Sequence, residues 1–179
     1  MKKIVIVISL LIIGTFFCSQ VKDKIAEIRT KCQKINQNIK TFSKKEKEDD
    51  DSSEEGGSVI AFYKDHKLQL ITAEYFGETG KWKDEYYFDN GNLVFVIKNQ
   101  FEYNRPIYWD KKMAKENDDT AYFDNKKTTK KTDKFYLDGD KVILWINNKN
   151  KEEQNNSAVF IKQESDVKKE GKRLEKLMK

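Results

Sequence analysis

The chain of 179 residues has room for one domain of moderate size. Charged residues make up 36% of it and the formal net charge is +5, yet aromatic residues make up 12%, which is more than a disordered chain carries. We therefore expect a folded core with charged margins. One histidine and one proline in the whole chain exclude histidine-rich metal tracts, proline-rich linkers and most acid–base chemistry that depends on imidazole.

Residues 1–19 have the features of a secretory signal peptide. Lys2 and Lys3 precede an apolar segment, residues 4–17, which is shorter than the roughly 20 residues that a membrane-spanning helix needs. We predict that the protein is exported and is periplasmic or secreted. The alternative is a lipid-anchored protein of the envelope, because Cys18 lies where a bacterial lipoprotein is cleaved and acylated. Cys32 then has no cysteine partner, so no disulfide framework is expected.

The segment 20–42 carries apolar residues at spacings of three and four, which predicts an amphipathic helix with a narrow apolar seam. The seam extends over only about three heptads, the lower limit for a coiled coil, so we expect the helix to pack on the domain's own sheet and the protein to be a monomer. Assembly with a partner through this seam is the alternative. The seam consists of Val21, Ile25, Ile28, Cys32, Ile35, Ile39 and Phe42.

Residues 43–58 contain no hydrophobic side chain. Seven acids, three lysines and two adjacent glycines are found among them. This composition predicts an acidic, flexible and solvated linker. The acids do not have the spacing of a calcium-binding loop.

Residues 59–179 are predicted to form an antiparallel sheet followed by a helix, in one domain with the N-terminal helix. Segments 82–88 and 93–97 flank the sequence Asp-Asn-Gly-Asn, in which Asn-Gly tolerates the positive φ angles of a hairpin turn. Residues 84–97 can be laid without a gap on residues 133–146, at an offset of 49 residues, and the segment 62–71 resembles both. Three related hairpins predict a meander of about six strands, with an exposed excursion over residues 110–134.

Two apolar runs indicate how the sheet is covered. Residues 93–97 and 142–146 are continuously apolar, which predicts that helices cover both faces of the sheet. The helix 20–42 supplies one cover, and a C-terminal helix with Ser165 or Asp166 as its N-cap supplies the other. The fold class is therefore α+β, an antiparallel β-meander flanked by N- and C-terminal helices. The C-terminal helix presents Val167, Gly171, Leu174 and Met178 at helical spacing.

Three motifs lie in or beside the predicted sheet: GETGK at residues 77–81, EYYFDNGNLVFV at residues 85–96 and YNRPIY at residues 103–108. Through them the chain resembles small exported proteins of the Bacteroidetes type. The resemblance implies a signal peptide or lipoprotein signal, an N-terminal helix and a second Tyr-Tyr-Phe-like hairpin, and it supplies no activity. The motif GKWK at residues 80–83, followed by YY and NGNL, is also similar to MORN-type repeats.

The reactive side chains form no recognisable catalytic or metal-binding pattern. His66 lies in a predicted turn, and one histidine with one lone cysteine cannot supply a zinc site. The glycines lack a phosphate-loop fingerprint. We predict no catalytic residue, no cofactor and no metal. The alternative function is a glycan-directed hydrolase that uses a carboxylate pair, for which the core half of the chain offers Glu78, Asp84, Glu85 and Glu102.

Aromatic side chains are the stronger candidates for binding. Flat aromatic faces bind sugars and apolar peptide side chains, although the same residues could be core edges and cross-strand pairs. We predict a non-enzymatic binding or structural interaction module of the cell envelope, with an envelope protein or a glycan as its partner. Only three arginines are present, so no nucleic acid partner is expected. The candidate ligand surface consists of Trp82, Tyr86, Tyr103, Tyr108 and Trp109, with Tyr122 as a further member.

Overall fold

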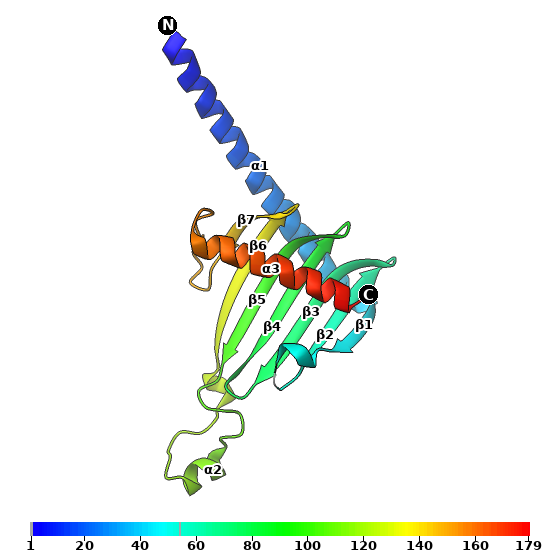
Figure 1. Ribbon diagram of the computed structural model, residues 1–179, viewed down its shortest axis with the longest axis vertical. Helices are drawn as coiled ribbons and strands as arrows, with labels where there is room; N and C mark the ends of the chain where they lie inside the picture. The colour runs from blue at the N-terminus through cyan, green and yellow to red at the C-terminus, as the bar shows by residue number, and fades with distance from the viewer. Residues whose placement is uncertain (1, 54) are drawn as a thin grey trace.

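The computed structural model describes residues 2–53 and 55–179, and the side chains of residues 2–19 and 51 lie outside this description. Figure 1 shows the order of its elements. The helices are α1 (Lys2–Asn38), α2 (Lys111–Glu116) and α3 (Ala158–Leu177), and the 3-10 turns are η1 (Ile39–Thr41), η2 (Asp50–Ser52) and η3 (Asn125–Lys127). The strands are β1 (Ser43–Glu48), β2 (Gly57–Lys64), β3 (Lys67–Gly77), β4 (Gly80–Asp89), β5 (Asn92–Glu102), β6 (Thr129–Asp138) and β7 (Lys141–Ile146).

The strands of the described chain form one sheet. Its seven strands lie in the order β1-β2-β3-β4-β5-β6-β7, and every neighbouring pair is antiparallel. The prediction of an α+β meander flanked by N- and C-terminal helices is confirmed. The sequence predicts about six strands, and β1 is the strand that it does not predict.

Helices cover both faces of the sheet, as the apolar runs predict. Figure 1 shows α1 and α3 on opposite faces. On the α1 face, Ile28, Cys32 and Ile35 pack in one hydrophobic cluster with side chains of β3, β4, β5 and β6. On the α3 face, the second cluster holds the residues of the predicted C-terminal seam, Val167, Leu174 and Met178 among them. Each helix therefore buries its apolar stripe against the sheet.

A β-bulge in each of the β2–β3, β4–β5 and β6–β7 hairpins changes which face of the sheet some apolar side chains point to. In β5, Leu93 pairs with Phe88 and Phe95 pairs with Tyr87, which leaves Val94 without a direct partner. Val94 and Phe95 consequently both join the α1-side cluster, whereas Val96 joins the α3-side cluster. The register shifts at the same place in the β2–β3 and β6–β7 hairpins.

The segment 43–58 differs from the predicted flexible linker. It contains η2 and the whole of β1, which is an edge strand with mostly exposed side chains. Lysines of β1 reach the last carbonyl groups of α3: Lys45 Nζ donates to Met178 O at 2.9 Å, and Lys47 Nζ donates to Leu177 O. A strand rich in Lys and Glu resists pairing with other chains, and its ammonium groups favour the negative end of the helix dipole.

Both terminal helices differ from their predicted bounds. α3 begins at Ala158 because the Ser157 hydroxyl caps it by accepting from Phe160 N at 3.0 Å, so Ser165 and Asp166 are interior residues. The predicted helix 20–42 ends earlier, at Asn38, and continues as η1. The α1 backbone also extends towards the N-terminus to Lys2, away from the sheet (Figure 1). The predicted signal peptide and the side chain of Cys18 lie outside the described side chains.

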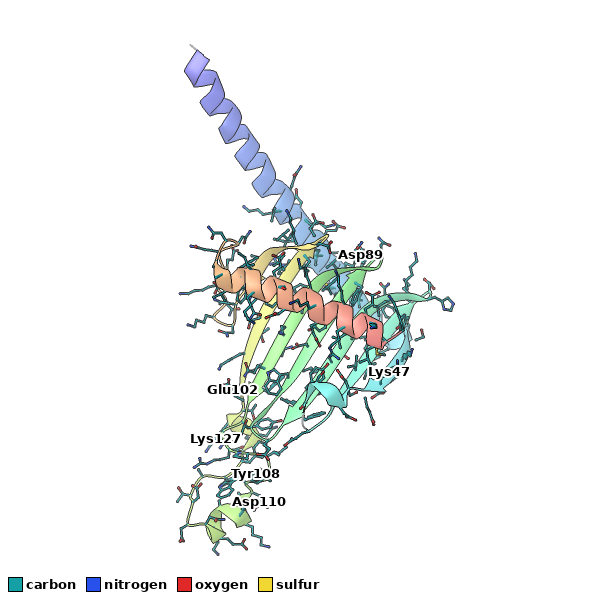
Figure 2. All side chains as sticks on the ribbon, viewed as in Figure 1. Lys47, Asp89, Glu102, Tyr108, Asp110 and Lys127 are labelled. Atoms are coloured by element: carbon teal, nitrogen blue, oxygen red, sulfur yellow. The ribbon has the colours of Figure 1, made fainter. Side chains whose placement is uncertain are left out.

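The excursion between β5 and β6 lies six to seven residues earlier in the chain than the predicted 110–134, and it is internally braced. It spans residues 103–128, since β6 already begins at Thr129. Asp110 caps α2 by accepting from Lys112 N at 2.9 Å and Met113 N at 2.8 Å. Figure 2 places Tyr108 and Asp110 in this excursion, beyond the end of the sheet. Among helices whose side chains are described, none is long and apolar enough to cross a membrane.

Candidate functional site

The α3 helix leaves part of its own sheet face uncovered. α3 crosses the strands on the side of the hairpin turns, and the strands continue beyond it towards the excursion (Figure 1). Because side chains alternate along a strand, Trp82 and Asp84 of β4 point to the same face as the buried Tyr86. The uncovered part of the α3 face therefore carries polar side chains next to the end of the core.

Cross-strand register places these side chains in two rows. Asp84 pairs with Lys98 of β5, and Lys98 pairs with Asp133 of β6. In the next row, Trp82 pairs with Gln100, and Gln100 pairs with Lys131. Directly opposite residues on one face lie about 4.5–5.5 Å apart, so each row is a continuous strip of side chains.

Two adjoining hollows lie over these rows and share Trp82, Asp84 and Lys98. Their volumes are about 290 Å³ and 630 Å³. We call the two together the α3-side groove. The smaller hollow is lined by the shared residues with Asn99, Gln100, Lys131, Asp133, Trp145, Asn148 and Gln163. The larger is lined by the shared residues with Ser52, Tyr75, Asp166, Lys169, Glu170 and Arg173.

Asp84 is the buried carboxyl of the groove. Its side chain is 7% exposed, and its Oδ1 accepts from the Asn99 backbone N–H at 3.2 Å. Burial raises the pKa of Asp84 to about 6, although Lys98 opposes this shift. One backbone donor leaves most of the acceptor capacity of the carboxyl unused. Asp84 therefore offers hydrogen-bonding capacity to a ligand in either hollow.

Tyr86 lies two residues from Asp84 along β4, on the same face of the sheet, and is completely buried. Its ring contacts the cluster below α3, where a Cβ on Gly171 would lie 3.7 Å from Tyr86 Cδ1. Burial raises the pKa of Tyr86, and the charge of Asp84 adds to the shift. The hydroxyl is close enough to Asp84 to affect its titration, but no hydrogen bond of normal geometry satisfies it. The floor of the groove thus contains hydrogen-bonding groups that have no partner within the fold.

A network of polar side chains closes the larger hollow at one end. Arg173 Nη2 donates to Asp49 Oδ2, to Tyr75 Oη and to Glu170 Oε1, each at 2.7 Å, and Tyr75 Oη donates to Asp49 Oδ2 at 2.7 Å. Burial alone would raise the pKa of Asp49, but hydrogen bonds from Arg173, Tyr75 and Ser52 outweigh it and lower that pKa. The network joins α3 to the segment that follows β1.

The smaller hollow ends at a tryptophan. Trp145 Nε1 donates to Asp133 Oδ1 at 2.8 Å. Its ring stacks on Phe135, with ring centroids 5.3 Å apart and an interplanar angle of 21°. The indole therefore fixes Asp133 in the wall of the groove, and Asp133 retains acceptor capacity on its second oxygen.

The predicted ligand surface does not lie in one place. Trp82 is 43% exposed and lines both hollows of the groove, as an aromatic ligand platform requires. Tyr86 is 0% exposed, so its inclusion in a ligand surface is wrong: strand alternation turns it into the core under α3. The remaining residues, Tyr103, Tyr108, Trp109 and Tyr122, belong to the excursion.

Most aromatic side chains of the excursion brace it. Tyr103 packs edge-on against Phe123 with ring centroids 5.2 Å apart, and Trp109 Nε1 donates to Asp119 Oδ2 at 3.2 Å. Tyr108 is the exception, with 51% of its surface exposed. The excursion thus has a structural use for these residues that the sequence pattern does not reveal.

The acids proposed for hydrolysis are separated from one another. Glu85 lies on the α1 face and accepts from Tyr87 Oη at 2.5 Å, whereas Glu102 pairs with Lys131 at 2.5 Å. Glu78 belongs to the turn between β3 and β4. Figure 2 shows Glu102 at the end of the sheet next to the excursion. Of the four acids, only Asp84 lines the groove.

Histidine and cysteine lie away from the groove. His66 adopts φ 61° in the β2–β3 turn and is exposed. Cys32 of α1 is buried against the sheet, and burial raises the pKa of its thiol to about 12, so the reactive thiolate is disfavoured. Within the described residues, no group of three or more histidine, cysteine, aspartate or glutamate side chains is arranged to hold a metal ion.

Asp133 is one of the groove residues that are not predicted from the sequence, although a signal for it exists. The 49-residue offset lays Asp133 directly on Asp84. Equivalent positions of consecutive hairpins fall on the same face of a meander and in the same row.

Comparison of the chain with protein families, with curated proteins and with solved structures finds no match.

Proposed function

We propose that this protein is an exported, non-enzymatic binding module of the bacterial envelope and that the α3-side groove holds its ligand. The observation that carries the proposal is the convergence of exposed Trp82 and under-used Asp84 on two adjoining hollows. A concave site with an aromatic face and a few convergent polar groups is the usual form of a ligand site.

The helix–sheet architecture supports the proposal by holding the groove rigidly. The floor belongs to β4, β5 and β6, which lie inside the sheet, and one wall belongs to α3. Side chains on such elements keep their positions without a ligand, so little conformational entropy is lost on binding.

Export is supported by the sequence of residues 1–19. Lys2, Lys3 and the apolar segment that follows are what a secretion signal requires. Mass spectrometry of the native N-terminus distinguishes the two forms of export. A free N-terminus near Gln20 indicates a periplasmic or secreted protein, and a diacylglyceryl group on Cys18 indicates a lipid-anchored one; an intact Met1 contradicts processing.

Co-sedimentation with isolated bacterial envelopes tests the binding function. We expect the native protein to co-sediment and Trp82→Ala to remain in the supernatant. Phe76→Ala is the matched control, because Phe76 is 41% exposed against 43% for Trp82 but lies on the opposite face, one strand away. Equal sedimentation of all three proteins contradicts the groove as the site.

Hydrolysis is the second candidate, because Asp84 and Asp133 line the same hollow. Two antiparallel strand spacings separate them by about 9–11 Å between Cα atoms. Carboxyl groups of inverting glycosidases lie about 6.5–9.5 Å apart with a water between them. Here Lys98 occupies the position between the two acids in the register, which favours binding over hydrolysis.

A reducing-end assay on envelope polysaccharides separates the two candidates. We expect no release of reducing ends by the native protein. Release that Asp84→Asn and Asp133→Asn each abolish, while Glu102→Gln retains it, would establish the hydrolase instead.

A further inference from the structure

The lining of the α3-side groove indicates the chemical class of its ligand. Resting on the proposed function, we infer that the groove binds a segment of a neutral, hydroxyl-rich glycan, with one sugar ring stacked on Trp82 and its hydroxyl groups bound by Asp84, Lys98 and Asp133.

The charges of the groove balance. Its lining has four acids, Asp84, Asp133, Asp166 and Glu170, and four bases, Lys98, Lys131, Lys169 and Arg173. A site for a polyanion would carry an excess of bases, as binding to a phosphate backbone requires. A balanced site favours a ligand without net charge.

Acceptors and donors alternate along the floor. The row Asp84–Lys98–Asp133 presents a carboxyl, an ammonium and a carboxyl on consecutive strands. The amide side chains of Gln100, Asn148 and Gln163 add groups that both donate and accept. Each hydroxyl group also both donates and accepts, so a ligand with hydroxyl groups on adjacent atoms matches this lining.

The groove is long and its aromatic face is open. The residues of α3 that line it run from Gln163 to Arg173, which is about 15 Å along the helix at 1.5 Å per residue. A small compact ligand would leave most of this length empty. A linear oligosaccharide fills such a length, and the apolar face of a sugar ring packs on an exposed indole such as that of Trp82.

An extended peptide fits the same length less well. Peptides bound in extended form gain affinity by pairing their main chain with the free edge of a sheet. The floor strands β4 and β5 are paired on both sides and expose no such edge.

Competition for envelope binding tests the inference. The protein with its native N-terminus is bound to isolated envelopes and then challenged with three soluble probes: a mixture of the neutral glycans dextran, mannan and laminarin, the polyanion polyphosphate, and an unstructured peptide mixture. We expect the neutral glycans alone to release the protein. Their direct binding to Trp82→Ala should be weakened about tenfold or more relative to the native protein.

Two further variants keep the result interpretable. Lys169→Trp narrows the larger hollow from the exposed side of α3, so the variant should fold normally and lose glycan binding. Phe76→Ala should retain it. Thermal unfolding monitored by circular dichroism confirms that each variant is folded.

The outcomes distinguish failure of the glycan inference from failure of the proposed binding function. Release by polyphosphate or by peptide, with envelope binding still dependent on Trp82, overturns the neutral glycan and leaves the groove as the binding site. Release by none of the probes also overturns the neutral glycan. Envelope binding that Trp82→Ala and Lys169→Trp both retain overturns the groove itself, and with it the proposed function.

Discussion

The β4–β5 and β6–β7 hairpins coincide position for position at an offset of 49 residues, and each has its bulge two residue pairs before the turn. They differ where the groove needs a particular chemistry. Asp84 accepts a single backbone N–H, whereas Asp133 accepts from the Trp145 indole. Tyr86 buries an unpaired hydroxyl where Phe135 has none. The shared features thus build the sheet, and the differences build the site.

The largest effect expected from this comparison is in the core, where the two hairpins are alike. Tyr86 is 0% exposed and Phe135 is 1% exposed, so Tyr86→Ala and Phe135→Ala should each lower the free energy of unfolding by about 3–5 kcal/mol. Urea unfolding measures both. Phe76→Ala removes an exposed ring and should cost less than about 1 kcal/mol. A small loss for only one of the core rings would contradict the equivalence of the hairpins.

Asp84→Asn should change how stability depends on pH. The folded pKa of about 6 exceeds the unfolded value of about 3.9, so the native state holds the proton longer and stability falls as pH rises from about 4 to about 6. Two pKa units correspond to about 3 kcal/mol. The variant should therefore be more stable than the native protein at pH 7, by up to this amount, and similar to it at pH 4.

Asp133→Asn is the matched control for this prediction. It makes the same substitution at the equivalent position and leaves Asp84, and hence the slope between pH 4 and 6, in place. Urea midpoints of the native protein and both variants, measured across the pH range, give the pH dependence of their stability. A native protein whose stability is flat between pH 4 and 6 would show that Asp84 is solvated.

The turns of the two hairpins provide a smaller contrast. Gly91 has φ +82°, whereas its counterpart Asp140 is not among the residues with positive φ. A left-handed conformation costs a residue with a Cβ about 1–2 kcal/mol, and nothing lies within 4 Å of a Cβ at Gly91 to add to this. Gly91→Ala should therefore destabilise the protein by about 1–2 kcal/mol, and Asp140→Ala should have almost no effect. Thermal unfolding measures the loss of stability in both variants. Equal losses would contradict a difference between the two turns.

The smallest effect expected is that of Tyr86→Phe, which gives β4 the residue type of β6. The hydroxyl is buried without a hydrogen bond, so its removal should leave stability unchanged or raise it by up to about 1 kcal/mol. Denaturant unfolding at pH 7 is sufficient to measure it. A loss of more than about 1 kcal/mol would mean that the hydroxyl has a partner that matters.

The fold is predictable from the sequence because local turn motifs and apolar runs indicate its hairpins. Asn90 and Gly91 supply the positive φ angles of their turn, and runs such as 93–97 require cover on both faces. β1 is not predicted because it is an edge strand of Lys, Glu and Ser with mostly exposed side chains, so it has no apolar pattern. The start of α3 is not predicted because Val159 and Ile161 are exposed, at 59% and 57%, and so do not join the apolar seam.

The site is predictable only in part. Trp82 is found from its residue type, but the aromatic residues of the excursion look the same in sequence. Asp84 is one of four candidate acids in the sequence, and nothing joins it to Asp133 until the register of three strands brings the two together across Lys98. Cross-strand register is set by bulges and turns acting over the whole sheet, so a local pattern does not contain it.

The three tryptophans allow the most direct test of the claim that the groove, and not the excursion, binds the ligand. Trp82 and Trp145 line the groove, and Trp109 lies in the excursion. Titration with neutral oligosaccharides released from bacterial envelopes, followed by the three indole N–H signals in a ¹H–¹⁵N spectrum, should shift the signals of Trp82 and Trp145 and leave that of Trp109 in place. A shift confined to Trp109 would contradict the account.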